Sequence, residues 1–336
     1  MNGISCQNAP WRITFETNPD RCNLHCIMCD THSIYLDNKK NRDGKKERLL
    51  PFYILEKVIR SAAGKGLREV IPSTMGEPLL YPEMEQLLSL LSELNLKLNL
   101  TTNGTFPLCG AGKWGDLILP IASDVKISMN GATQKTAESI MRGLNYEKQL
   151  ENAQIFINKR DHFRTLGYTP NVTMQATFMR SNILELPEML EKAIEMGFDR
   201  FKGHHVWITN PHISDETLRI PKYREQWNDT VAELKKIAGS KIALANVLPF
   251  EDSNNSFSDT ICPFLGKEAW IGANGDFNVC CAPSQEREVF GTFGNVYETD
   301  FMDLWHSDCY KKFVSGWGQY DLCNHCNMRI SGSENI

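Results

Sequence analysis

Three cysteines close together near the start of the chain are the residues best suited to chemistry. Cys22, Cys26 and Cys29 occur in the stretch CNLHCIMCD, with no fourth cysteine beside them. A structural zinc site is tetrahedral and closed, and its usual signature is two pairs of ligands. A four-iron cluster also binds thiolates, and three cysteines leave one of its irons with an open coordination position. The triplet therefore predicts a cluster with one iron free to bind a ligand or substrate.

A second group of cysteines lies near the end of the chain: Cys262, Cys280, Cys323 and Cys326. Four thiolates are enough to saturate either an iron-sulfur cluster or a zinc ion, so both alternatives stay open at this point. Cys281 is a surplus thiol beside one of the four, and it is either a small buried residue, a hydrogen-atom donor or an exchangeable ligand. Cys109 and Cys309 are weaker candidates for such a donor.

Alternating strands and helices must position these cysteines. From Trp11 to about Trp207, short apolar or β-branched runs alternate with amphipathic segments, which is typical of βα units around a parallel sheet. The predicted strands are Arg12–Phe15, Glu69–Pro72, Lys97–Thr101, Asp124–Met129, Asn171–Phe178 and Arg200–Val206. The predicted helices are Tyr53–Ala63, Pro82–Leu94, Tyr146–Phe163, Leu184–Met196 and Lys222–Ile237.

Six such units favour an α/β fold in which the strands form a partial (β/α)6 TIM-like barrel. The segment Glu251–Asn255 is polar and turn-like, and a cysteine-rich region begins just beyond it. We therefore expect two domains, a barrel over residues 1–250 and a small cysteine-rich domain over residues 251–336.

Composition limits the partners and the compartment. A net charge of -5 and a pI near 5.9 give no global attraction to nucleic acid or to an anionic membrane. The start of the chain has no secretory signal pattern, and no apolar run approaches the roughly 18 to 20 residues that span a bilayer. We therefore expect a cytoplasmic protein. Eleven cysteines in a reducing compartment favour metal binding over disulfides.

The spacing Cys22-x3-Cys26-x2-Cys29 after a predicted first strand resembles that of the radical S-adenosylmethionine (SAM) enzymes. The resemblance implies that the amino and carboxylate groups of SAM chelate the fourth iron. Gly76-Glu77-Pro78, after the second strand, resembles the family's Gly-Gly-Glu-Pro element, whose backbone meets the methionine amino group. Met75 stands where the first glycine of that element usually lies.

Four more residues match positions that bind SAM in the family. Asn103 follows the third strand in Thr-Asn-Gly, as in many relatives. Ser128 and Arg142 resemble the pair that contacts the ribose and the carboxylate, and a guanidinium suits a planar anion. Met28 stands where an aromatic residue often packs beside the adenine, a role that a flexible apolar side chain can fill.

The second cysteine group resembles the twitch domain, the shortened form of the SPASM extension. The segments Phe293–Val296 and Leu304–Ser307 also look like that extension. The resemblance implies one auxiliary four-iron cluster held by the four late cysteines. The implied cofactors are thus two 4Fe-4S clusters, one that binds SAM and one auxiliary, together with SAM itself.

The resemblance also implies a reaction: the first cluster reduces SAM, and a 5'-deoxyadenosyl radical removes a hydrogen atom from the substrate. A reductant such as flavodoxin or ferredoxin is the implied protein partner. Only 21 residues precede Cys22, which favours a small-molecule substrate over a peptide. The first hypothesis is an oxidoreductase or epimerase that acts on a small polar metabolite.

Two histidines are candidate catalytic residues for that reaction, together with Cys281. His204 and His205 end the predicted sixth strand, where barrel sites gather, and histidine accepts a proton near neutral pH. The enzyme alternative is radical modification of a peptide or protein residue. The non-enzyme alternative is an iron-sulfur carrier or scaffold.

Overall fold

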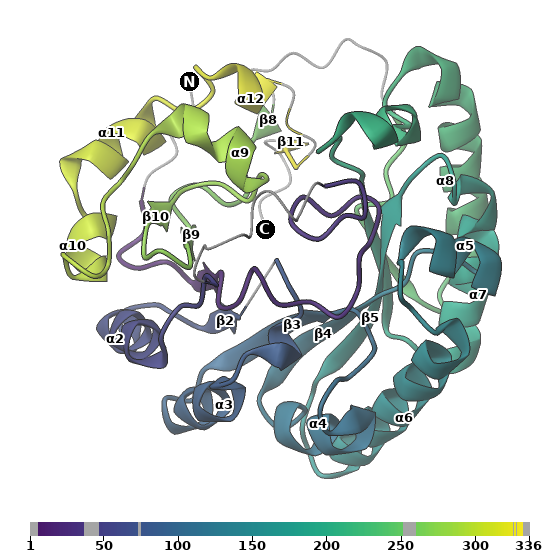
Figure 1. The fold of residues 1–336 in the computed structure, drawn as a ribbon, viewed down its shortest axis with the longest axis horizontal. Coiled ribbons are helices and arrows are strands. Elements are labelled where there is room, and N and C mark those ends of the chain that lie inside the picture. Colours follow the sequence, from purple (N-terminus) through teal and green to yellow (C-terminus); the bar gives the residue numbers. More distant parts are fainter. Residues whose placement is uncertain are drawn as a thin grey trace.

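A large sheet of nine strands organises the computed structural model, which describes residues 6–36, 47–72, 75–250, 260–324, 326 and 328–331. The helices lie on the outer, convex side of the curved sheet, and the segment 16–36 crosses its inner side (Figure 1). The described part of the chain contains no helix with the length and apolarity needed to cross a bilayer.

The six predicted strands are confirmed, with ends that differ by two residues or fewer. Neighbouring strands pair in parallel and in chain order, which builds the expected partial barrel. The strands are β1 (Arg12–Phe15), β2 (Glu69–Ile71), β3 (Lys97–Thr102), β4 (Ala122–Ser128), β5 (Asn171–Phe178) and β6 (Arg200–His205).

The five predicted helices are also confirmed to within two residues at each end. Helix α7 shows why: Leu186, Met189, Leu190 and Ala193 form one buried stripe, and the helix ends at Gly197 with φ of 86°. The helices are α2 (Phe52–Ala62), α3 (Met84–Glu93), α6 (Tyr146–Thr165), α7 (Leu186–Met196) and α8 (Arg224–Ala238).

Two short helices that we did not predict complete the βα units. Helix α4 (Gly110–Ile118) contains three glycines, which weaken the helical signal of its sequence. Helix α5 (Gln134–Ile140) has only seven residues, and it begins where the Thr133 side chain accepts a hydrogen bond from Thr136 N.

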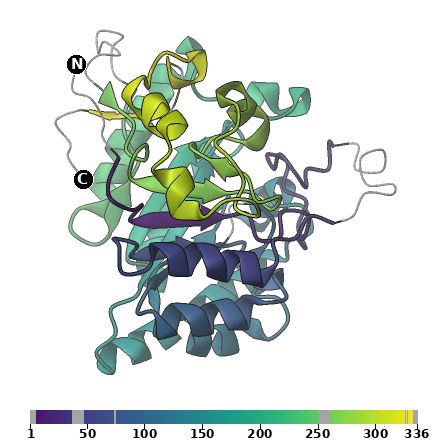
Figure 2. The same ribbon diagram turned by 90° about the vertical axis from the view of Figure 1, so that its left-hand side faces the viewer.

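The cysteine-rich part extends the barrel sheet, which the sequence did not predict. Strand β9 (Glu268–Ile271) pairs in parallel with β1, and β10 (Phe277–Asn278) pairs antiparallel with β9. Figure 2 shows these green C-terminal elements beside β1 and α2. At the other edge of the sheet, β7 (Ala243–Ala245) follows β6.

The remaining elements surround these C-terminal strands. The helices are α9 (Ser284–Arg287), α10 (Phe301–Trp305), α11 (Asp308–Ser315) and α12 (Asp321–Asn324); β8 (Thr260–Ile261) pairs with β11 (Ile330–Ser331). Short 3-10 turns are η1 (Pro78–Leu80), η2 (Ile183–Glu185), η3 (Pro211–Glu216), η4 (Pro221–Tyr223) and η6 (Glu288–Phe290). The predicted turn at Glu251–Asn255 and the domain boundary near it lie outside the described residues.

Candidate active site

The three early cysteines lie in a loop that follows β1 and crosses the carboxyl ends of the barrel strands. Backbone His25 N donates a hydrogen bond to Arg142 O at 2.8 Å, which ties the loop to the turn between α5 and α6. The Thr209 hydroxyl, beyond β6, donates to Met28 O at 3.4 Å. The loop is therefore fixed at both sides of the barrel opening.

Hydrogen-bond donors surround the cysteine sulfurs of this loop. Leu24 N lies 3.5 Å from Cys22 Sγ, and His32 N lies 3.2 Å from Cys29 Sγ. The Asn103 amide, at the end of β3, lies 3.9 Å from Cys22 Sγ. Because hydrogen bonds to sulfur tune the reduction potential of an iron-sulfur cluster, these donors suit a cluster site.

The three thiols also lie near enough to influence one another. Burial raises the pKa of Cys26, and the charges of Cys29 and Cys22 add to that effect. Burial likewise raises the pKa of Cys29 to about 11. Cluster binding must therefore displace protons from thiols that hold them at neutral pH.

The described residues contain no group of three His, Cys, Asp or Glu side chains placed to hold a single metal ion. A four-iron cluster does not need such convergence, because each thiolate binds a different iron. The donor set at this loop, three half-buried thiols with N–H groups aimed at their sulfurs, fits a cluster.

Gly76 packs directly against the cysteine loop. Its φ is 73°, and an added Cβ would lie 2.4 Å from Asn18 O and 2.7 Å from Arg21 O. The next residue adds two hydrogen bonds to this contact: Glu77 N donates to Arg21 O at 2.8 Å, and Asn18 Nδ2 donates to Glu77 O at 2.8 Å. Only glycine fits here, which agrees with the backbone role that the family resemblance implies for this turn.

The Glu77 carboxylate organises the turn from within the protein. It is 1% exposed and accepts hydrogen bonds from Leu79 N at 3.2 Å, Thr102 Oγ1 at 2.8 Å and Asn103 N at 2.8 Å. It therefore joins the end of β2 to the end of β3. Burial raises the pKa of Glu77 to about 7, and the three hydrogen bonds oppose that rise.

This raised pKa predicts a pH-dependent stability term that Glu77→Gln removes. Between the unfolded value of 4.5 and the folded value of about 7, the folded protein binds more protons at this site, so stability rises as pH falls. As the pH falls from 7 to 4.5, the free energy of unfolding of the wild type should therefore rise, relative to that of the variant, by up to about 3 kcal/mol. Denaturant melts across that range measure the difference, and parallel curves would contradict the assignment.

One glutamine holds the ends of two strands together beside the site. Gln149 of α6 donates from Nε2 to Asn103 O at 2.7 Å and to Ser128 O at 2.9 Å. Ser128 is the last residue of β4 and is half-buried, and the Arg142 side chain is exposed. The structure thus brings the cysteine loop, Glu77, Asn103 and Ser128 to one end of the barrel. The sequence did not reveal that Gln149 helps to hold these strand ends together.

The four late cysteines also gather. Burial raises the pKa of Cys262 to about 12, and the charges of Cys280 and Cys326 contribute. Burial raises the pKa of Cys323 in the same way, again with contributions from Cys280 and Cys326. Backbone Ala282 N lies 3.4 Å from Cys280 Sγ, a contact of the kind seen in the first group.

Three arginines that the sequence did not single out surround the late cysteines. Arg287 donates to Cys280 O at 3.3 Å. Burial raises the pKa of Cys326, and the charges of Arg329 and Arg219 lower it. Arg219 belongs to the segment after β6, so the barrel itself contributes a cation to this site. These charges suit an anionic cluster with four thiolate ligands.

Cys281 lies in this second group. The interaction between the two adjacent thiols lowers the pKa of Cys280 and raises the pKa of Cys281, and burial adds to the rise at Cys281. The alternative donors lie elsewhere: Cys109 precedes α4, and Cys309 is exposed in α11.

A matched pair of variants separates the two adjacent cysteines. Cys281→Ala should keep about eight irons per chain after anaerobic reconstitution, because the four cysteines that the family resemblance implies as ligands remain, and Cys280→Ala should keep about four. Iron and acid-labile sulfide determination measures both. Equal iron loss in the two variants would contradict the choice of Cys280 as the ligand.

The two candidate histidines of β6 lie on opposite faces of the strand. His205 packs among Phe178, Trp227 and Phe250, with ring centroids 4.6–5.6 Å away, and burial lowers its pKa to about 3. The structure therefore does not bring His205 to the cysteine loop. His204 is on the inner face, and burial followed by the charge of Lys202 lowers its pKa to about 4.

Comparison with known families agrees with this site. Residues 19–176 match the radical SAM superfamily, and residues 262–327 match the SPASM iron-sulfur cluster-binding domain. The first range contains all three early cysteines, and the second contains all four late ones.

Individual relatives cover different shares of the chain. A "tungsten-containing aldehyde ferredoxin oxidoreductase cofactor-modifying protein" of Pyrococcus furiosus is 22% identical over 92% of this chain and 85% of its own length. A PqqA peptide cyclase of Methylorubrum extorquens is 27% identical over 55% of this chain and 43% of its own. Streptococcus suis SuiB, solved with its precursor peptide SuiA, has a TM-score of 0.66 at 19% identity over 97% of this chain and 71% of its own. The chain therefore belongs to the radical SAM superfamily and carries a C-terminal SPASM iron-sulfur domain.

Proposed function

We propose that this radical SAM enzyme modifies a residue of a peptide or protein. The observation that carries the proposal is the likeness to PqqA peptide cyclase, a relative whose name gives a peptide as substrate. SuiB, with a similar fold, was solved with a precursor peptide. The relatives thus favour the alternative over the small polar metabolite and its oxidation or epimerisation.

The residues of this chain divide the work between two sites. We propose that Cys22, Cys26 and Cys29 hold one four-iron cluster, while Gly76 and Glu77 present the backbone that positions SAM. When bound, the reduced cluster and SAM together supply a 5'-deoxyadenosyl radical that abstracts a hydrogen atom. The protein must fix the target C–H bond beside the SAM site and exclude water.

The late cysteines form the second site, which would determine whether the product is oxidised. We propose that Cys262, Cys280, Cys323 and Cys326 hold the auxiliary cluster, with Arg219 and Arg329 balancing its charge. This cluster can accept an electron when the product is oxidised. Cys281 beside it is the proposed thiol for returning a hydrogen atom when the product is not oxidised. One electron from the external reductant and one proton would then restore the thiol from the thiyl radical.

A protease-sensitivity experiment tests the substrate class. Reconstituted holoenzyme, SAM and dithionite are mixed with extract of the source cells, and 5'-deoxyadenosine is measured before and after the extract is digested by an immobilised protease. We expect digestion to remove the stimulation of SAM cleavage and mass spectrometry to find a modified peptide in the undigested extract.

The other outcomes decide against the proposal. Stimulation that survives digestion and follows the low-mass fraction would return the substrate to a small metabolite. Two intact clusters without any cleavage of SAM would favour the iron-sulfur carrier or scaffold.

A further inference from the structure

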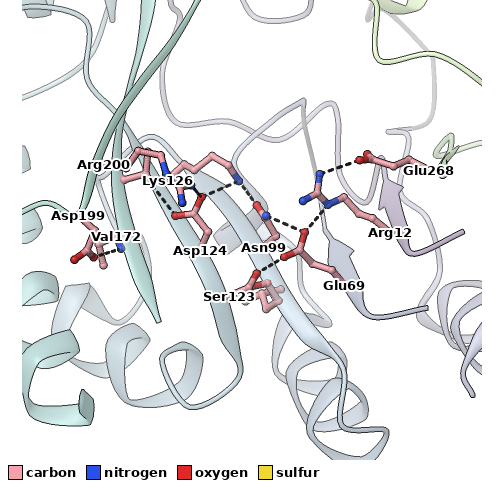
Figure 3. Close-up of polar contacts among 12 residues, drawn as sticks. Arg12, Glu69, Asn99, Ser123, Asp124, Lys126, Val172, Asp199, Arg200 and Glu268 are labelled. Carbon is pink, nitrogen blue, oxygen red and sulfur yellow. Dashed lines mark hydrogen bonds and ion pairs between the residues drawn. The ribbon is translucent and has the colours of Figure 1, made fainter. Parts of the chain in front are cut away.

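Charged side chains line the inner face of the barrel below the SAM site. Arg12 of β1 bonds to Glu69 of β2 and lies 3.1 Å from Glu268 of β9 (Figure 3). Arg200 of β6 pairs with Asp124 of β4 at 3.1 Å. The first pairs join β1 to β2 and β9, and the last pair joins β4 to β6.

The remaining cation in Figure 3, Lys126, is also matched. It donates a hydrogen bond to Asn99 and lies 4.0 Å from the Asp124 carboxylate. Each of Arg12, Lys126 and Arg200 therefore has an acidic partner, on a neighbouring strand for the two arginines and on its own strand for Lys126.

Lys202 differs from these three cations. It lies two residues after Arg200 on β6, so its side chain is on the same inner face. In the described part of the chain, its ammonium group makes no hydrogen bond and no ion pair within 4 Å, although the charge of Asp124 acts on it from farther away. Among the charges named here, four cations face three acids, Glu69, Asp124 and Glu268, and burial raises the pKa of Glu268 to about 7. Lys202 is thus the surplus cation among these seven described residues.

Strand register places Lys202 beside the SAM site. Ser128 of β4 is paired with Gln175 of β5, which is paired with Lys202 of β6. Neighbouring strands lie about 4.8 Å apart, so the backbones of Ser128 and Lys202 are about 10 Å apart. His204 lies one step farther up the same face, toward the cysteine loop.

This row of residues remains accessible. Ser128, Gln175, Lys202 and His204 are all half-buried, although they occupy the middle of a covered sheet. Burying an ammonium group without an anion beside it has a free-energy cost, which a bound anion would offset. Lys202 also lies two strands from Ser128, a residue of the proposed SAM site.

We propose that Lys202, with His204 as a hydrogen-bonding neighbour, binds a carboxylate of the peptide substrate in the barrel lumen. The inference rests on the proposed peptide substrate and adds its charge: the segment that enters the barrel is anionic. The carboxylate belongs either to an Asp or Glu side chain or to the end of the peptide. Lys202 acts as a specificity-determining residue that holds the target segment beside SAM.

Three N-acetylated tripeptides test this charge preference without turnover. Reconstituted holoenzyme with SAM and no reductant is dialysed to equilibrium against labelled acetyl-Gly-Glu-Gly-amide, acetyl-Gly-Gln-Gly-amide and acetyl-Gly-Gln-Gly with a free carboxyl end. We expect one of the two anionic probes to bind roughly tenfold or more tighter than the neutral one, because a hydrogen bond to a charged group contributes about 1.5–3 kcal/mol. The favoured probe identifies the source of the carboxylate.

Variants assign the preference to Lys202. Lys202→Met should remove it, Lys202→Arg should retain most of it, and Lys241→Met, a change at an exposed lysine, should leave it unchanged. Iron content checks that each variant is folded and loaded. Equal binding of all three probes by the wild type, or an unchanged preference in Lys202→Met, would overturn the proposal. Because no step of this assay needs turnover, failure here is separate from failure of the extract experiment, which tests the peptide as substrate.

Discussion

Cys26→Ala is expected to abolish reductive cleavage of SAM and to lower the iron content from about eight to about four per chain. Cys26 is the middle cysteine of the triplet that we propose as cluster ligands, and the charges of Cys22 and Cys29 act on its thiol. With only two of the three proposed ligands left, the cluster that would bind SAM should not assemble stably. The auxiliary cluster should persist, because its four proposed ligands lie in the separate group after residue 260.

Anaerobic reconstitution, iron analysis and chromatographic measurement of 5'-deoxyadenosine test this expectation. Cys309→Ala is the matched control, since Cys309 is an exposed thiol outside both groups. We expect that control to match the wild type in iron and in cleavage. Normal cleavage by Cys26→Ala would remove the early cysteines from the radical chemistry.

Much of the barrel could be predicted because its strands are short buried runs between clear amphipathic helices. Strand β5 is buried along almost its whole length, and α7 presents a regular apolar stripe. The cysteine spacing was equally informative, because ligands in a loop are close in sequence. Local patterns of this kind can be recognised without knowledge of the tertiary structure.

Contacts between distant segments could not be predicted. Strand β9 has four residues and joins β1 across more than two hundred positions, a pairing that no local pattern encodes. Gln149 of α6 donates hydrogen bonds to the ends of β3 and β4, and the charge of Arg219, in the segment after β6, acts on the late cysteines. Each depends on the sheet register, which is set only when the barrel forms.

The substrate was the weakest inference from the sequence for a related reason. The sequence predicts a small polar metabolite, whereas one relative is named a peptide cyclase and another was solved with a precursor peptide. The charge of the lumen is the feature that bears on specificity, and it emerges from strand register. Lys202 is an ordinary lysine in the sequence, and it becomes distinctive only because Arg12, Lys126 and Arg200 have acidic partners.

Gly76→Ala is expected to reduce SAM cleavage by at least about a hundredfold, because displacing a reacting group by about 1 Å has an effect of that size. Two terms act at this position. A left-handed φ of 73° disfavours any Cβ, and that Cβ would also overlap Asn18 O at 2.4 Å and Arg21 O at 2.7 Å. Both obstructing atoms are backbone oxygens of the loop that leads to Cys22, so relief requires the loop to move away from the turn.

Gly64→Ala isolates the first term. Gly64 has a φ of 74°, and its added Cβ would meet no atom within 4 Å. The control should therefore lose only about 1–2 kcal/mol of stability and retain SAM cleavage. Thermal melts and 5'-deoxyadenosine formation are measured for both variants in the reconstituted holoenzyme. If Gly76→Ala behaves like Gly64→Ala, the close contact between this turn and the cysteine loop is not needed to position SAM; if only Gly76→Ala loses cleavage while it keeps its iron, the loss arises from the displaced backbone.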